Sequence, residues 1–377
     1  MRVVALMRIA LVVPGGVDRS GRERVIPILL WLIERLARRH TVHAFVLRHH
    51  PEPCTYELLG ATVHDLGRAS GPTGLRSILQ LRHLVRALRL AGPFDVIHGY
   101  WGVPAGLPAA MAGRWLRTPT VVTFCSGEFV CLPGYGLQCT WRGRLTVALA
   151  ARLATRVHVT SQYMEGLAKA AGLRVDLVPL GVDTRTFRPR AAEPPAGPPW
   201  RLLHVATLNR VKDQPTLLRA LARVVALRPG VHLDIVGEDT LGGAVQTLCA
   251  GLQLGHHVTF HGFQPTERLP AFYQRAHLLV VTSRHEAAGV VVLEAAASGL
   301  PTIGSAVGYI ADWSPSAAYG VPAGDEMALA DGILVLLGDP ARRERLAQEA
   351  ARRARAQDAD WSANAMERLY NAGLPHR

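Results

Sequence analysis

The sequence has no long uncharged apolar run. No window of its 377 residues offers about 18 apolar residues without a charge, so a membrane-spanning helix is not expected. The N-terminal stretch MRVVALMRIALVVPGG is apolar, but Arg8 interrupts it, which favours a first buried strand ending in a glycine turn over a signal peptide. We therefore expect a cytoplasmic protein, with at most a peripheral contact at the inner face of the cell membrane.

Cysteine and lysine are scarce. The five cysteines are an odd number without CxxC spacing, which favours a reducing compartment and argues against a structural zinc site. They are Cys54, Cys125, Cys131, Cys139 and Cys249. Only two of the 42 basic residues are lysines, Lys169 and Lys212. The arginines form no arginine-rich tract and no nucleic-acid-binding motif is present, so nucleic acid is not an expected partner.

The net charge of +13 is concentrated in the first half of the chain. Residues 1–180 hold 22 Lys plus Arg against 10 Asp plus Glu, a difference of +12, which leaves 20 against 19 for residues 181–377. An arginine-rich composition explains part of this excess. The remainder fits an anionic membrane surface or a phosphate-bearing substrate.

One basic segment, LRSILQLRHLVRALRL at 75–90, has helical periodicity. Its apolar stripe and the arginines along the edge of that stripe are Ile78, Leu81, Val85 and Leu88, and Arg82, Arg86 and Arg89. The pattern predicts either a core-facing helix with a basic rim or a helix that docks on anionic lipid.

Length and patterning predict an α/β protein of two domains. A chain of 377 residues with 49% hydrophobic residues has material for two cores. Strand-like apolar runs alternate with helical patterns, which indicates parallel sheets with right-handed crossovers. The runs are VVALMRIALVV, TVHAFVL, FDVIHG, TVVTF, RVHVTS and VDLVP in the first half, and RLLHVAT, VHLDIVG, HVTFHG, LLVVTS and LPTIG in the second. The segment RPRAAEPPAGPPW, residues 188–200, has five prolines and is typical of a linker. We thus expect domains at 1–187 and 201–357, and a C-terminal helix at 358–377 that packs back across the junction.

Two carboxylates lie where such a fold binds ligands. The run LLVVTS, residues 278–283, predicts a buried strand, and a helical pattern from about Gly289 stops at Gly299. Glu286 then lies in a strand-to-helix loop and Glu294 one to two turns into the helix. Because loops at the carboxyl ends of parallel strands line the ligand crevice, the pair predicts a binding site.

These residues resemble a known family. EAAGVVVLEAAASGLPTIGS resembles the E-x7-E signature of the retaining family 4 glycosyltransferases. LVVPGG, DVIHGYWGVPAG, LGVDTRTFRP and ATLNRVKDQPTLLRAL agree with other segments of that family in order and spacing. The resemblance covers nearly the whole chain. It implies the GT-B architecture of two facing Rossmann-like domains with parallel sheets, in which the C-terminal helix packs back on the N-terminal domain.

The resemblance also implies the activity, which is transfer of a sugar with retention from a nucleoside-diphosphate-sugar to a hydroxyl of a glycan, a lipid-linked or a small-molecule acceptor. No cofactor and no metal ion are expected. Glu286 would hold the sugar as a catalytic residue, Glu294 the ribose, and Lys212 the diphosphate. The other donor-binding candidates are Thr207, Arg210, Ala288, Gly289 and Val290, the last three at a helix N-terminus that suits a diphosphate.

On the N-terminal side, the resemblance singles out five residues. Gly15 and Gly16 would let backbone approach a phosphate, although a plain tight turn explains them too. His98 ends the strand FDVIH and would be catalytic, unless it is a hydrogen-bonded core histidine. Cys125 and Glu128 would contact the acceptor.

The sequence departs from the family's pattern at several positions. Thr207 and Cys125 stand where relatives have arginine and histidine, and Ala287 and Ala288 replace the middle of E-G-F-G. The triplet Asp358–Asp360 spells the DxD metal motif of another glycosyltransferase architecture, but its position before a terminal helix favours capping. Two alternatives therefore stay open: a nucleotide-sugar epimerase of the same shape, and a non-catalytic nucleotide-sugar-binding protein.

Overall fold

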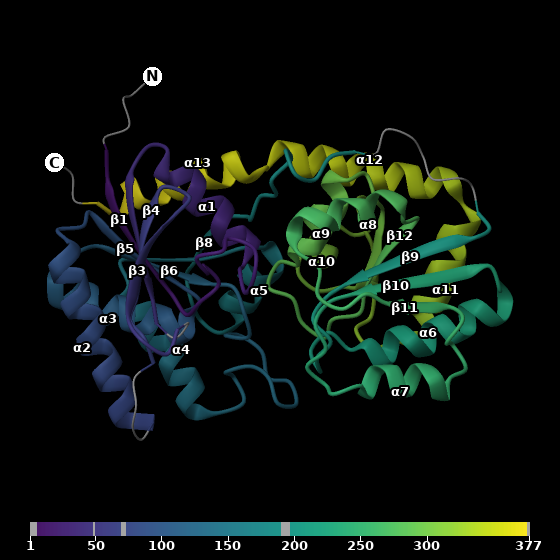
Figure 1. Ribbon diagram of the computed structural model, residues 1–377, viewed down its shortest axis with the longest axis horizontal. Coiled ribbons are helices and arrows are strands. Elements are labelled where there is room, and N and C mark those ends of the chain that lie inside the picture. Colours follow the sequence, from purple (N-terminus) through teal and green to yellow (C-terminus); the bar gives the residue numbers. More distant parts are fainter. Residues whose placement is uncertain (1–5, 48–49, 69–72, 190–196, 375–377) are drawn as a thin grey trace. The chain divides into compact units, whose positions relative to one another are not determined.

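The computed structural model describes residues 6–47, 50–68, 73–189 and 197–374. The chain divides into two compact units (Figure 1). Unit 1 holds Met1–Leu180 with Ala359–Arg377, and unit 2 holds Gly181–Asp358. Among the described helices, none is both long and apolar enough to cross a bilayer. The core of the predicted linker, 190–196, lies outside the described residues.

Unit 1 is built on an eight-stranded sheet of order β3-β4-β2-β1-β5-β6-β7-β8. Its strands are β1 Arg8–Val13, β2 Thr41–Val46, β3 Cys54–Leu58, β4 Ala61–Asp65, β5 Val96–Tyr100, β6 Thr120–Phe124, β7 Arg156–Val159 and β8 Asp176–Leu177. All neighbours pair in parallel except β3 and β4, which form an antiparallel hairpin at the edge. The sequence analysis had missed that hairpin.

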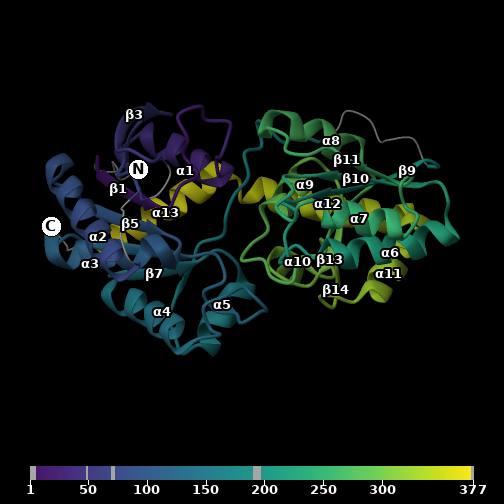
Figure 2. The ribbon, with the colours of Figure 1, turned by 60° about the horizontal axis from the view of Figure 1, so that its bottom comes forward.

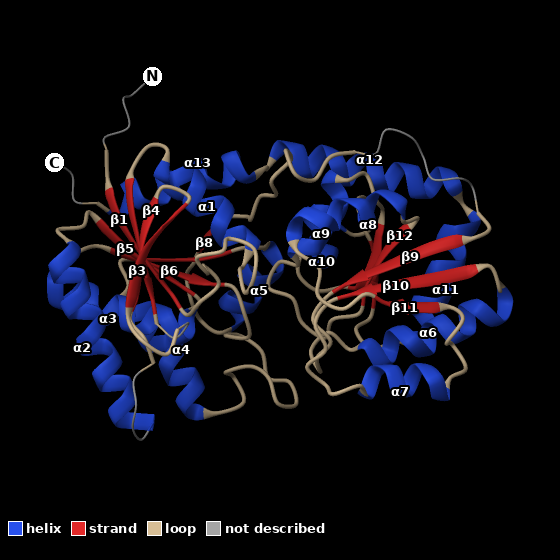
Figure 3. Ribbon diagram, viewed as in Figure 1, coloured by secondary structure: helices blue, strands red, loops and turns tan. Residues whose placement is uncertain are grey.

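Helices cover both faces of this sheet (Figure 3). They are α1 Pro27–Ala37, α2 Thr73–Ala91, α3 Leu107–Leu116, α4 Trp141–Leu153, α5 Gln162–Ala170 and α13 Ala359–Gly373. Successive side chains of β1 point to opposite faces. Accordingly Ile9 and Leu11 pack in the core formed with α1 and α13, whereas Ala10 and Val12 pack in the core formed with α2 and α3.

The predicted C-terminal helix is confirmed as α13, which packs against α1. The Arg35 Nε donates to Asp360 Oδ1 at 3.0 Å, and the Oε1 of Glu367 lies 2.7 Å from His40 Nε2. Asp360, a member of the DxD triplet, thus serves helix packing. Segment 75–90 lies in α2, where Val85 and Leu88 are buried but Ile78 is 58% exposed.

Unit 2 is a second doubly wound domain, whose parallel sheet has the order β11-β10-β9-β12-β13-β14. The strands are β9 Trp200–Val205, β10 Val231–Val236, β11 Val258–Phe260, β12 Leu278–Val281, β13 Thr302–Ser305 and β14 Tyr319–Val321. The helices are α6 Gln214–Leu227, α7 Ala244–Gly251, α8 Leu269–Arg275, α9 Val290–Ala297, α10 Tyr309–Trp313, α11 Glu326–Gly338 and α12 Pro340–Ala356. Of the strands, the sequence analysis had missed only β14 in this unit.

Candidate active site

The predicted carboxylate loop lies at the switch point of the unit 2 sheet. From β9 the chain proceeds to β10 and β11 on one side, and β12 then pairs with the opposite edge of β9. The loops that leave the carboxyl ends of β9 and β12 therefore diverge, and such a point is where open α/β sheets bind ligands. These two loops carry Lys212 and Glu286.

Several bonds tie the two loops together. The Thr282 hydroxyl donates to the carbonyl oxygen of Lys212 at 2.9 Å, and the Arg284 N–H donates to the carbonyl oxygen of Val211 at 2.7 Å. The Arg284 guanidinium also forms an ion pair with Asp213, whose side chain caps the start of α6. The two loops thus form one connected surface, called here the floor of the site, above β9 and β12.

Lys212 and Glu286 form an ion pair on this floor. The Ser283 hydroxyl donates to Glu286 Oε1, the same oxygen that Lys212 contacts, at 2.6 Å. Burial by itself would raise the pKa of Glu286, but the Lys212 ammonium and the Ser283 hydroxyl outweigh it and hold the pKa below its usual value. The lowered pKa favours the ionised carboxylate of Glu286, and its pairing with Lys212 was not foreseen from the sequence.

Thr207 and Arg210, the other candidates in the β9 loop, are exposed. The Thr207 carbonyl oxygen accepts from the side-chain amide of Gln214 at 3.2 Å. Beneath the loop, the Nδ1–H of His204 donates to the carbonyl oxygen of Val280 at 2.9 Å, and burial lowers the pKa of His204 to about 4. The site therefore rests on a neutral histidine.

The loop after β12 enters α9 through glycine. Gly289 has φ +89° and precedes Val290, the first residue of α9, so its backbone is one that side chains rarely adopt. The Tyr309 N–H donates to Ala288 O at 2.7 Å, and a Cβ on Gly308 would come within 2.4 Å of that oxygen. Loop 286–289 is thus held against the segment at Gly308 and Tyr309, and the N–H groups that begin α9 lie at its end.

Glu294 lies in α9 and is only 3% exposed. Its Oε2 accepts from the hydroxyl of Tyr273 in α8 at 2.6 Å. Burial raises the pKa of Glu294 to about 7, although the Tyr273 hydroxyl opposes that shift. The pKa of Glu294 thus lies near neutral pH, where both its protonated and its ionised forms are populated.

In unit 1, Gly15 and Gly16 follow β1, next to the switch point where β1 meets β5. Gly16 has φ +83°, and a Cβ there would lie 2.5 Å from the Ile26 side chain. The Ile26 N–H donates to Gly16 O at 2.9 Å. Close packing against residue 26 accounts for this glycine.

His98 is a fully buried core histidine, the alternative that the sequence had left open. Its Nδ1 lies 2.7 Å from the Tyr370 hydroxyl, and its Nε2 lies 2.6 Å from Thr123 Oγ1. Thr123 Oγ1 also lies 2.6 Å from His158 Nε2. Burial, reinforced by the nearby His158, holds the pKa of His98 well below its usual value. Both nitrogens of His98 are thus engaged by partners inside the unit in this structure.

Glu128 is also buried, and it holds two loops together. Its Oε1 accepts from the N–H of Gly102 at 2.9 Å, and its Oε2 accepts from the N–H of Ser126 at 2.6 Å. Cys125 lies beside it, half-buried, and burial raises the pKa of its thiol well above the usual value. Both residues shape the loop after β6.

The cysteine pattern had predicted a reducing compartment and therefore reduced cysteines. That prediction is wrong for one pair of cysteines. Cys131 and Cys139 form a disulfide with a Cα–Cα distance of 4.7 Å. The bond closes the loop that follows Glu128. Spacing could not reveal it, because only the folded loop brings the two residues together.

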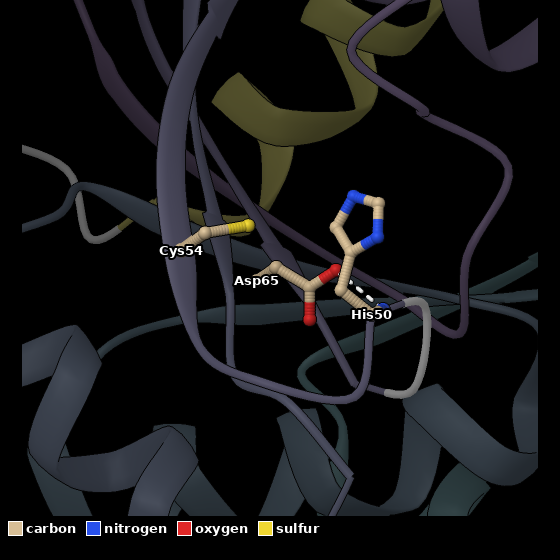
Figure 4. A group of neighbouring side chains, drawn as sticks. All are labelled: His50, Cys54 and Asp65. Carbon is tan, nitrogen blue, oxygen red and sulfur yellow. Dashed lines mark hydrogen bonds between the residues drawn. The ribbon is translucent and has the colours of Figure 1, made fainter.

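A group of potential metal ligands lies at the edge of the unit 1 sheet (Figure 4). His50, Cys54 and Asp65 each offer one ligand atom within 4.8 Å of the others. However, the two Asp65 oxygens already accept backbone N–H groups, from His50 at 3.0 Å and Gly67 at 2.9 Å. The Arg19 guanidinium lies 4.0 Å from Cys54 Sγ and would oppose a cation there. These contacts stabilise the hairpin loops, and we assign no metal site.

Two protein-family models together match nearly the whole chain. Residues 25–181 match the description "Glycosyl transferase 4-like domain", and residues 187–353 match "Glycosyl transferases group 1". The D-inositol 3-phosphate glycosyltransferase of Frankia alni is 31% identical over 303 residues, which cover 73% of this chain and 72% of that protein. Enzymes of the same name from other organisms also match. The matched region covers 46% of the length of the Segniliparus rotundus protein and 82% of the length of the Pseudarthrobacter chlorophenolicus protein.

Solved structures share the fold. Sucrose-phosphate synthase from Thermosynechococcus elongatus superposes with a TM-score of 0.82 at 25% identity, over 97% of this chain and 98% of that one. Anabaena HepE in complex with UDP-glucose superposes with a TM-score of 0.75 at 19% sequence identity, over 98% of this chain and all of that one.

Proposed function

The chain belongs to the family 4 glycosyltransferases, retaining enzymes that transfer a sugar from a nucleotide-sugar donor, and from this premise we propose how its own residues act. The observation that carries the proposal is the Lys212–Glu286 ion pair at the switch point of unit 2, next to the N-terminus of α9. An ammonium, a carboxylate and helix N–H groups together match a diphosphate joined to a sugar.

Glu294 would hold the donor ribose. A carboxylate can accept hydrogen bonds from both hydroxyls of a diol, and Oε1 of Glu294 is not used by the Tyr273 bond. The same bond fixes the orientation of the carboxyl group. Glu294 would thus anchor the nucleotide, with Tyr273 as its positioning residue.

Lys212 and the first N–H groups of α9 would bind the diphosphate. An ammonium has three donors, so Lys212 can keep one on Glu286 while another reaches a phosphate oxygen. The dipole of α9 favours negative charge at Val290. We propose that these charges serve in place of a metal ion, so that transfer persists in the presence of a chelator.

Glu286 would orient the transferred sugar. Its two contacts among the described residues are both to Oε1, which leaves Oε2 for a sugar hydroxyl. The reaction is front-face: the bond from the anomeric carbon to the diphosphate breaks as the acceptor oxygen bonds to the same face. The departing diphosphate oxygen accepts the acceptor's proton. Lys212 and the α9 N–H groups stabilise the charge on that leaving group.

The donor we propose is a UDP-sugar, since HepE, which shares the fold, was solved with UDP-glucose. The acceptor is a hydroxyl of a glycan, a lipid-linked sugar or a small molecule. In unit 1 the loops at Gly15 and Cys125 would contact it, and Glu128 and His98 would shape those loops. We propose a cytoplasmic setting for this reaction.

A thermal-shift panel of UDP-, GDP- and ADP-glucose tests donor binding. A ligand at about 100 times its Kd stabilises the folded state by about 2.7 kcal/mol. We expect the UDP-sugar to raise the melting temperature of the wild type and much less that of Glu294→Ala. A matched control, Glu326→Ala, removes a partly exposed carboxylate of the same unit, which pairs with Arg219. Equal shifts in both variants would contradict the assignment of Glu294.

Labelled UDP-glucose, incubated with and without acceptor sugars, tests the reaction. Transfer requires an acceptor, whereas conversion of the donor alone would indicate an epimerase. Tight binding without turnover on any acceptor would favour the non-catalytic alternative, which Cys125 and Thr207 had suggested.

A further inference from the structure

Three neighbouring helices of unit 1, α2, α3 and α4, cover the same sheet face and lie beside one another in both views (Figures 1 and 2). Each buries one side, and Val85, Ala109 and Val147 are among the buried residues. Their opposite sides face outward and are called here the α2–α4 face. No described element of unit 1 covers it.

The α2–α4 face is unusually apolar for an exposed surface. Thirteen large hydrophobic side chains are exposed among the described residues, and seven of them belong to these three helices. They are Ile78 and Leu90 of α2, Met111 and Trp115 of α3, and Trp141, Leu145 and Leu149 of α4. Three helices of 19, 10 and 13 residues, 42 in all, thus carry more than half of these side chains. Such concentration marks an interaction surface.

The α2–α4 face is basic and has no acid. The three helices contain eight arginines, four in α2, one in α3 and three in α4, and no aspartate or glutamate. With 29 acidic residues in 377, an even distribution would place about three acids in 42 residues. Arg86, Arg114 and Arg144 are exposed and form no ion pair among the described residues. The Arg89 guanidinium lies 5.8 Å from the Trp115 ring centre, so charge and apolar surface are interleaved.

An arginine-rich composition does not produce this pattern elsewhere. Helix α12 has six arginines, but Arg352 and Arg353 pair with Glu349. Its exposed surface therefore carries both signs of charge and is neutralised in part. On the α2–α4 face, Arg86, Arg114 and Arg144 have no such acidic partner among the described residues.

We propose that the α2–α4 face docks on an anionic lipid bilayer. Aliphatic and indole side chains on basic helices enter the boundary between headgroups and acyl chains, while arginines contact anionic headgroups. A nucleic acid would use the arginines but leave Leu145, Leu149 and Met111 in water. A second copy of the chain would bring two acid-free basic faces together, which their like charges oppose.

Docking would bring unit 1 to the surface where a lipid-linked acceptor is found. This last step rests on the proposed function, whereas the docking itself does not. Of the three acceptor classes proposed above, the α2–α4 face favours the lipid-linked one.

Sedimentation with vesicles tests the proposal. The full chain should bind vesicles of equal parts phosphatidylcholine and phosphatidylglycerol and not phosphatidylcholine alone. Binding should fall as salt is raised from about 0.1 M to 1 M, since the Debye length drops from about 10 Å to 3 Å. Arg86→Gln with Arg89→Gln should weaken partitioning by about 25-fold, from about 1 kcal/mol for each arginine. The matched control is Arg345→Gln with Arg355→Gln, two exposed arginines of α12.

A second pair of variants tests the apolar contribution. Leu145→Gln with Leu149→Gln should reduce binding, whereas Leu227→Gln with Val335→Gln, at exposed positions of unit 2, should not. Quenching of tryptophan fluorescence by brominated lipid should be lost in Trp115→Phe with Trp141→Phe. Thermal protection by a UDP-sugar should persist in all these variants, because its site lies in unit 2. Loss of that protection would concern the proposed function alone.

Four results would overturn the proposal. The first is absence of vesicle binding, and the second is equal binding to neutral and anionic vesicles. The third is a loss of vesicle binding in the α12 control variant as large as that in the α2 variant. The fourth is binding of an RNA or DNA fragment without vesicle binding. A dimer that persists at high salt, and that dissociates in the variant Leu145→Gln with Leu149→Gln, would show that the face serves self-association instead.

Discussion

Lowering the pH should weaken donor binding through Glu294. Its pKa in the folded protein is about 7, against an ordinary value of 4.5, because the carboxyl is buried in α9. Two ribose hydroxyls that donate to the carboxylate stabilise only the ionised form, so binding must release the proton. We expect affinity for a UDP-sugar to fall by up to about tenfold for each pH unit below 7 and to level off above it.

The same shift predicts how stability varies without ligand. Between pH 4.5 and 7 the folded protein keeps a proton on Glu294 that the unfolded chain has lost. This contribution to the free energy of unfolding is present in full below 4.5 and is lost as the pH rises through 7. The loss is about 1.4 kcal/mol per pH unit and roughly 3 kcal/mol in all. In Glu294→Gln this part of the pH dependence should vanish.

Calorimetry in buffers of different ionisation enthalpy measures the released proton. At pH 7 the wild type should release about half a proton per UDP-sugar bound, since half of the carboxyls are protonated there. Glu294→Gln should release none. Tyr273→Phe removes the hydrogen bond that opposes the shift, so the release should move to higher pH. Equal release by wild type and Glu294→Gln, or an affinity independent of pH, would refute this reasoning.

Three other predictions concern the site's architecture. Lys212→Met leaves the half-buried Glu286 carboxylate without its cation, so it should lower the free energy of unfolding by about 1–3 kcal/mol. Adding Glu286→Gln should restore stability but not sugar transfer. An unchanged melting temperature for Lys212→Met would contradict this. In Gly289→Ala the new Cβ lies 3.5 Å from the nearest atom, in Val292, so the free energy of unfolding should fall only by the backbone strain, about 1–2 kcal/mol. In Gly308→Ala the new Cβ lies 2.4 Å from the carbonyl oxygen of Ala288, so denaturant titrations should show a larger loss. Cys125→Ala should keep most transfer activity, and Glu286→Ala should lose most of it by loosening the sugar's placement, as initial rates will show; the reverse order would point to a thiol-dependent reaction.

The sequence predicted the site's loops better than its contacts. Glu286 was located correctly in a strand-to-helix loop and Glu294 in the helix that follows, because buried strands, glycine stops and helix periodicity are local signals. The partners of these residues were not predicted. Ser283 ends the predicted strand LLVVTS, and Tyr273 stands in a segment without a distinctive pattern. No local signal indicates which side chain a carboxylate will meet.

His98 and Glu128 show the same limit in unit 1. Their position at strand ends suggested contact with substrate, but the positions alone could not exclude internal partners. Tyr370 lies 272 residues from His98 in sequence, and only the return of α13 to unit 1 brings the two rings together. A strand-end polar residue therefore needs its tertiary surroundings before a role can be assigned.

By itself the sequence determined two parallel α/β units, a helix that returns to the first, and a basic first half, since periodicity and charge are properties of residues close together in the chain. Tertiary structure alone decided the antiparallel hairpin of β3 and β4, the pairing of Lys212 with Glu286 across 74 residues, and the raised pKa of Glu294. It also decided that the arginines of α2, α3 and α4 share one acid-free face. Burial, ion pairing and surface charge depend on which distant segments pack together, and chain-local preferences do not specify that packing.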